Sequence, residues 1–262
     1  MTTAAPTLRQ LTRPASVLLV VAAGGWLAVV AVARGMGAMP GTMGLSFGVF
    51  VGVWSLMMTA MMLPTIAPFA ALYTRALTGH RPRRIAELAT GYLLVWTFAA
   101  GPAYALAWLA GELAGTRPAA RVMAAAIFAA CGIYLLTPVK DRCLAKCRSP
   151  LGFVLKYGSY RGRLRDLRVG MNHGAYCLAC CWALMAILIA AGLMNLAVMV
   201  ALAAVVLAEK NWRWGPGLSR AVGVAALILA VAVVFWPSLV AGLYQAPGMP
   251  GGGMSRSAML TR

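Results

Sequence analysis

The side chains best suited to chemistry lie within nine consecutive residues of this 262-residue chain. They are His173, Cys177, Cys180 and Cys181. In a helix with 3.6 residues per turn, these positions fall within about 100° of arc, and the rise from His173 to Cys180 is about 10.5 Å. Thiolate and imidazole groups are ligands for soft or borderline ions such as Cu(I) and Zn(II). The spacing therefore predicts a metal-binding helix face, with Asn172 as the N-cap.

A second cysteine pair precedes this stretch. Cys143 and Cys147 are four residues apart, which also places them on one face of a helix. If both groups lie on the same side of a membrane, four to six nitrogen and sulfur ligands can converge there. The spacing is not that of a zinc finger, because no second histidine pair follows. We expect Cys143 and Cys147 to complete or relay the site, whereas the isolated Cys131 is expected only to pack.

Methionines form a further group of soft ligands. Four of them are stacked at helical spacing: Met57, Met58, Met61 and Met62. Such a stripe can be simple core packing, but thioethers also bind Cu(I), and these residues could conduct it. Five more methionines fall in segments predicted to be exposed outside the membrane: Met36, Met39, Met43, Met249 and Met254.

The elements that carry these residues are predicted to be membrane-spanning helices. Of the residues, 62% are hydrophobic and 11% are charged, with a mean hydropathy of +0.81, which excludes an ordinary soluble domain. Continuous apolar runs, most of them close to the ~20 residues a span needs, favour helices over β-barrel strands. Seven such runs are found, at about 15–33, 45–72, 86–110, 119–138, 173–191, 194–208 and 218–243. We expect an all-α, polytopic transmembrane bundle in a single domain, 1–262, with a kink or end at Pro64 or Pro68.

The basic residues predict the orientation of the bundle. With the N-terminus inside, 18 of the 23 Lys and Arg residues fall on the cytoplasmic side, nine of them in a basic loop at 139–170. This is a positive-inside pattern and predicts N-in, C-out topology, with the basic loop on anionic lipids. No aromatic-interleaved basic patch supports nucleic-acid binding. Glu209 and Lys210 are expected to mark the cytoplasmic boundary, Asn195 to cap a helix, and 245–262 to be a flexible tail rich in Met, Gly and Pro.

Two stretches of the sequence resemble a known family. The first is Trp54 to Pro64, and the second runs from Leu136 through Cys143, Cys147, the His173–Trp182 block and Asn195 to Lys210. Over about residues 45–215 the chain resembles bacterial integral membrane proteins described as predicted metal-binding proteins, with proposed copper-chaperone roles. The resemblance implies a multi-pass metal-handling protein of the bacterial inner membrane. The resemblance does not extend to the first helix or the C-terminal tail, so it does not support a role for the methionines there.

Two functions compete on these observations. The first is binding of copper, as Cu(I), with zinc as the other candidate metal. The copper would be handed over or translocated, with a cuproprotein or metallochaperone as the candidate partner. This would make the protein a chaperone or transport component rather than an enzyme. The alternative is a membrane thiol-disulfide oxidoreductase, because Cys177-Leu178-Ala179-Cys180 is a CxxC pair near a helix N-terminus. A structural subunit whose sulfur atoms only pack is a third reading.

Overall fold

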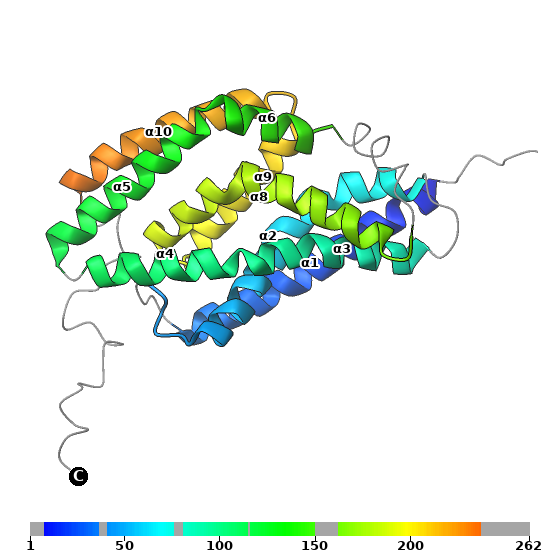
Figure 1. Cartoon of the computed structure of the whole chain (residues 1–262), viewed down its shortest axis with the longest axis horizontal. Coiled ribbons are helices and arrows are strands. Elements are labelled where there is room, and N and C mark those ends of the chain that lie inside the picture. The colour runs from blue at the N-terminus through cyan, green and yellow to red at the C-terminus, as the bar shows by residue number, and fades with distance from the viewer. Residues whose placement is uncertain (1–7, 37–40, 76–80, 115, 150–161, 237–262) are drawn as a thin grey trace, which may run out of the picture.

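The computed structural model describes residues 8–36, 41–75, 81–114, 116–149 and 162–236. Within these ranges the chain forms nine α-helices and no strands, so the predicted all-α class is confirmed (Figure 1). The helices are α1 (Leu8–Met36), α2 (Phe47–Arg75), α3 (Arg81–Phe98), α4 (Ala100–Leu113), α5 (Arg117–Leu135), α6 (Pro138–Cys147), α8 (Arg165–Ala191), α9 (Leu196–Asn211) and α10 (Gly215–Phe235).

Six of the helical segments described are long and apolar enough to cross a membrane. Helices α3 and α4 together make one of them, the 32-residue segment Pro82–Leu113. Helix α9 corresponds to the predicted run 194–208, but its 16 residues reach only about 24 Å, short of the ~30 Å apolar core of a bilayer. The predicted helical bundle is thus confirmed, and among the described residues six segments, rather than the seven expected, have the length and composition of a membrane span. Its N-in orientation remains a prediction from the charges.

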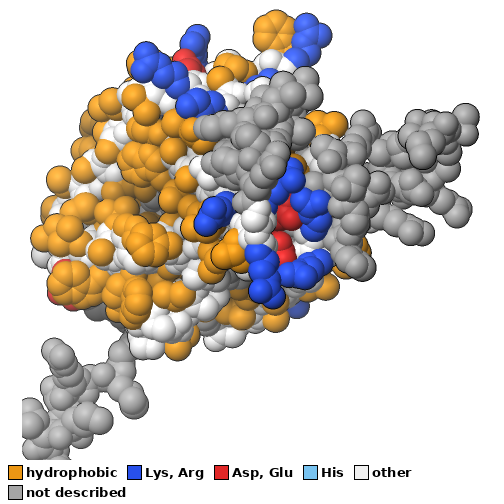
Figure 2. Space-filling model, turned by 45° about the vertical axis from the view of Figure 1, so that its right-hand side comes forward, with side chains coloured by type: hydrophobic (Ala, Val, Ile, Leu, Met, Phe, Trp, Pro, Cys, Tyr) orange, Lys and Arg blue, Asp and Glu red, His pale blue; other side chains and the backbone are white. Residues whose placement is uncertain are grey.

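The outside of the bundle is strongly apolar. Figure 2 shows hydrophobic side chains over much of one face, with Lys and Arg side chains gathered toward the top and right of the view. Among the most exposed apolar side chains are Phe98, Val20 and Ile228, with 85%, 70% and 64% of their surface accessible. An exposed apolar surface of this extent suits contact with lipid.

Helix α8 lies at the centre of the bundle and packs against α3, α5, α6 and α9. In its most apolar stretch 67% of the residues are buried, against 22% for α1. Glycines allow α3 to approach α8 closely. A Cβ on Gly91 would collide with the carbonyl of Leu167, and one on Gly170 with that of Leu88. The cysteines of α8 consequently face protein rather than lipid.

Three local predictions can be compared with the helices. Asn172 is not an N-cap, because α8 begins at Arg165 and the Asn172 side-chain amide donates to the Arg168 carbonyl within the helix. Helix α2 does not end at Pro64 or Pro68 but continues through both. Asn195 does cap α9, since its side-chain oxygen accepts a bond of 3.2 Å from the Val198 amide.

The predicted loop 139–170 is helical at its beginning and end. Pro138 starts α6, and the Thr137 hydroxyl caps it by accepting from the Lys140 amide at 3.3 Å. Residues 150–161 lie outside the described ranges, as do the tail 245–262 and the outer methionines Met39, Met249 and Met254, and nothing is described of the Met36 side chain. Met43, expected to be exposed, is only 2% accessible and packs into the core.

Candidate metal site

The cysteines predicted to bind metal are buried inside the bundle. Cys177, Cys180 and Cys181 on α8 are 0% accessible, and Cys147 on α6 is 8% accessible. Cys143, one turn before Cys147, is half-buried. All are free thiols. Burial shields these sulfur atoms from water. Cys143 is the exception, because its side chain is only partly covered by the protein.

Sulfur atoms from α6 and α8 meet at Cys180. Its Sγ lies 3.7 Å from the Cys147 Sγ and 3.3 Å from the Cys181 Sγ. A metal bonded to two sulfur atoms at about 2.3 Å and at a tetrahedral angle holds them about 3.8 Å apart. The spacing between Cys147 and Cys180 therefore suits a shared metal ion. These two residues are 33 positions apart, so the pairing is a product of the fold.

Cys177 has different partners, which lie on α3 and α9. Its Sγ is 2.9 Å from the Tyr92 hydroxyl and 2.8 Å from the Lys210 ammonium nitrogen. Lys210 also donates to the Thr65 hydroxyl at 3.2 Å. Lys210 is 7% accessible and Glu209 is 0% accessible, so both side chains lie inside the protein. Their place at the cytoplasmic boundary stays a prediction. A buried ammonium group needs a negative partner, and Cys177 as a thiolate would supply one.

A second buried cation holds α6 against the sulfur cluster, the name used here for Cys147, Cys177, Cys180 and Cys181. Lys140, with a side chain 0% accessible, donates to the Glu209 carboxylate at 2.7 Å and to the Cys180 carbonyl at 2.6 Å. Burial lowers the pKa of Lys140, but the nearby Cys181 and Glu209 groups outweigh that effect and raise the pKa above its usual value. Arg148 at the end of α6 also donates to the Glu209 carbonyl. These bonds hold Cys147 beside Cys180.

His173 and the four methionines of α2 surround the same region. The His173 ring stacks on Phe69 with 4.6 Å between centroids, and it lies beside the Tyr92 ring. The predicted methionine stripe is buried, at 0–1% accessibility for each member. It ends one helical turn before Thr65, and the Tyr92 hydroxyl that contacts Cys177 also donates to the Met62 carbonyl at 3.4 Å. The stripe thus leads to Cys177, although packing alone would also account for its burial.

In the part of the chain described, no three His, Cys, Asp or Glu side chains are arranged to hold a metal ion together. What the fold offers instead is pairs of sulfur atoms, at Cys147–Cys180 and Cys180–Cys181. Metal binding at the cysteines of α6 and α8, at His173 and at the α2 methionines remains a prediction. The buried Lys140, Lys210 and Glu209 are residues that the sequence did not single out as part of this region.

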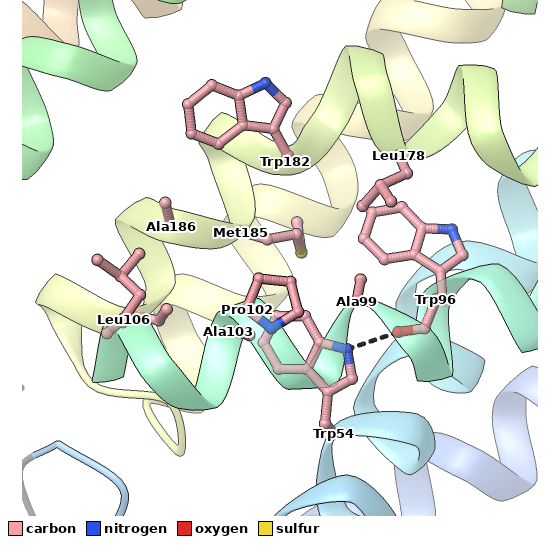
Figure 3. Close-up of a pocket in the computed structure, with 11 residues that line it drawn as sticks. Trp54, Trp96, Ala99, Pro102, Ala103, Leu106, Leu178, Trp182, Met185 and Ala186 are labelled. Carbon is pink, nitrogen blue, oxygen red and sulfur yellow. Dashed lines mark hydrogen bonds between the residues drawn. The ribbon is translucent and has the colours of Figure 1, made fainter. Parts of the chain in front are cut away.

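An apolar cavity of about 410 Å³ lies next to the cluster (Figure 3). Its walls include Trp54, Trp96, Trp182 and Met185, and the Trp54 indole donates to the Trp96 carbonyl at 2.9 Å. No cysteine lines it. The cavity is therefore separate from the sulfur cluster and offers no soft ligand except the Met185 thioether.

The fold is a helical bundle with helices apolar enough to cross a membrane, and many of the reactive side chains in its interior are cysteines and methionines. A family model described as PpoB2, copper chaperone, matches residues 51–233. The chain belongs to this copper chaperone family, and the resemblance expected from its motifs is confirmed. No curated protein and no solved structure matches the chain. The match contains every helix of the sulfur cluster, and it connects the chain to copper.

Proposed function

We propose that the protein binds Cu(I) at the sulfur cluster in the bacterial inner membrane and hands it to a partner protein. The observation that carries this proposal is the contact of 3.7 Å between Cys147 and Cys180, which joins thiols from two helices. Soft thiolates bind Cu(I), as they bind Zn²⁺. Membership of a copper chaperone family favours copper of these two metals.

The accessibility of the thiols suggests a path for the metal. Cys143 is half-buried, Cys147 lies one helical turn further along α6, and Cys147 contacts the fully buried Cys180. Copper would pass between thiols by ligand exchange along this series. Under the positive-inside pattern, α6 and the first turns of α8 lie on the cytoplasmic side, so the partner at Cys143 would be a cytoplasmic metallochaperone or cuproprotein.

The methionines of α2 extend this path into the membrane. Met57, Met58, Met61 and Met62 are buried between the outer end of α2 and the contacts of Thr65 with Tyr92 and Lys210. Thioethers bind Cu(I) without a negative charge, so they can pass the ion through an apolar helix bundle. In this extension of the proposal, the four methionines would carry Cu(I) across the membrane, and Cys177 would be the first thiol in contact with them.

The proposal is tested by the metal content of the detergent-purified, full-length protein after growth with copper. We expect about one copper per native chain and loss of most of it in Cys177→Ser/Cys180→Ser. Cys131→Ser is the matched control, because Cys131 is equally buried but lies alone on α5. Equal, substoichiometric copper in all three proteins would contradict the proposal.

The alternative, a thiol-disulfide oxidoreductase using Cys177 and Cys180, is separated from copper binding by thiol trapping in cells. A redox enzyme cycles this pair between thiol and disulfide forms during turnover. The Cys180 Sγ bonds to the Cys177 carbonyl at 3.2 Å, and its sulfur neighbours are Cys147 and Cys181. A Cys177–Cys180 disulfide that forms and disappears with cell redox state, together with absence of copper, would favour the alternative.

A further inference from the structure

The apolar cavity beside the sulfur cluster lies between helices α4 and α8, with α2 and α3 closing its inner side (Figure 3). Its volume of about 410 Å³ falls within the range of about 300–1,000 Å³ that is typical of ligand sites. Helix α4 packs against α2, α3 and α5, and in the described part of the chain it has no extensive packing against α8. The cavity therefore takes up the space between two helices that touch little.

The walls of the cavity suit a hydrocarbon group. Every side chain that lines it is a Trp, Ala, Pro, Leu, Ile or Met, and none carries a charge. The Trp54 indole N–H is already bonded to the Trp96 carbonyl at 2.9 Å. A buried water needs about 2–4 polar partners, and these walls do not supply them. A polar ligand would meet the same difficulty.

The cavity is elongated along α8. Its lining residues on this helix run from Leu178 to Ile189 and recur at the spacing of a single helix face. Eleven residues of helix rise by about 16 Å. The hydrocarbon core of a bilayer is ~30 Å thick, so one leaflet accounts for about 15 Å of it. The length of the cavity thus matches one lipid chain in one leaflet.

The cavity is open toward the outside of the bundle. Pro102 on α4 and Trp182 on α8 both line it and are exposed, Trp182 with 40% of its surface accessible. Its floor includes Trp54 and Met185, which are only 3% and 2% accessible. The lining part of α8 belongs to the second half of that helix. Under the positive-inside pattern, this half lies in the outer leaflet.

We propose that the cavity binds one acyl chain of a phospholipid from the outer leaflet, which enters between α4 and α8. The chain would provide the packing that these two helices do not make with each other. An unfilled apolar cavity loses the dispersion contacts of the atoms that line it, so filling is favourable even though lipid chains are as apolar as the walls. The site contains no cysteine, so the inference does not depend on metal binding.

The test uses the full-length protein in nanodiscs that contain phosphatidylglycerol with a photoactivatable diazirine in one acyl chain. After illumination, mass spectrometry should find adducts on the floor residues Trp54 and Met185, as well as on exposed side chains such as Phe98. Phosphatidylglycerol with the diazirine on its headgroup should leave the floor unlabelled. Adducts confined to exposed side chains with the chain probe, or floor labelling by the headgroup probe, would overturn the proposal.

Two alanines of α4 provide matched variants. Ala103 lines the cavity, whereas Ala105 is exposed and does not line it. Ala103→Phe should fill the cavity and abolish the adducts on its floor, while Ala105→Phe should keep them at the native level. If Ala103→Phe does not fold, Ala186→Leu fills the same cavity from α8. Floor adducts at the native level in a folded cavity-filling variant would also overturn the proposal.

Discussion

Replacing Lys140 by methionine should be among the most damaging single changes in this protein. Both Lys140 and Glu209 have side chains that are 0% accessible, and their charged groups are 2.7 Å apart. Removing one partner of a buried ion pair leaves an uncompensated charge and costs about 3–5 kcal/mol. The variant also loses the bond from Lys140 to the Cys180 carbonyl. We expect the free energy of unfolding to fall by that amount.

A more exposed ion pair between α6 and α10 provides the control. Asp141 and Arg220 are 3.0 Å apart, with side chains 34% and 64% accessible, so Asp141→Asn should cost at most about 1 kcal/mol. The double variant Lys140→Met/Glu209→Met should recover much of the loss, because no lone charge remains. Reversible unfolding in mixed detergent micelles measures all three. A cost for Lys140→Met no larger than that for Asp141→Asn would refute the reasoning.

Two further predictions concern packing and accessibility. Gly170→Ala should reduce the free energy of unfolding by about 1–3 kcal/mol, because its Cβ would meet the backbone of α3, whereas Gly101→Ala meets nothing within 4 Å and should be tolerated in the same unfolding assay. Maleimide should modify the half-buried Cys143 of the native protein before Cys177 and Cys180, as followed by mass spectrometry; equal rates for the three thiols would contradict the burial pattern.

Much of the fold follows from local sequence signals. Long apolar runs identify the spans, since length and hydropathy are properties of each segment alone. The start of α8 could not be found this way. Asp166 and Arg168 look like loop residues, yet Asp166 is buried because Arg84, 82 positions earlier, pairs with it at 2.7 Å. Such a partner becomes visible only in the folded chain.

The candidate site could be predicted from the sequence only in part, because several of its contacts join residues that are far apart in the chain. Helical periodicity alone places Cys177 and Cys180 on one face, and both are buried together on α8. Periodicity does not show that Cys177 meets Lys210 while Cys180 meets Cys147. Lys210 and Glu209 end an apolar run and therefore resemble a membrane boundary. Their burial depends on partners on α2, α6 and α8, which are far away in the sequence.

The most direct test of the central claim is X-ray absorption spectroscopy at the copper edge of the copper-loaded, full-length protein. Binding by the sulfur cluster predicts Cu(I) with a shell of sulfur atoms at about 2.3 Å, and loss of that shell in Cys177→Ser/Cys180→Ser. Copper(II) surrounded by nitrogen and oxygen, or an identical spectrum from the double variant, would contradict the account.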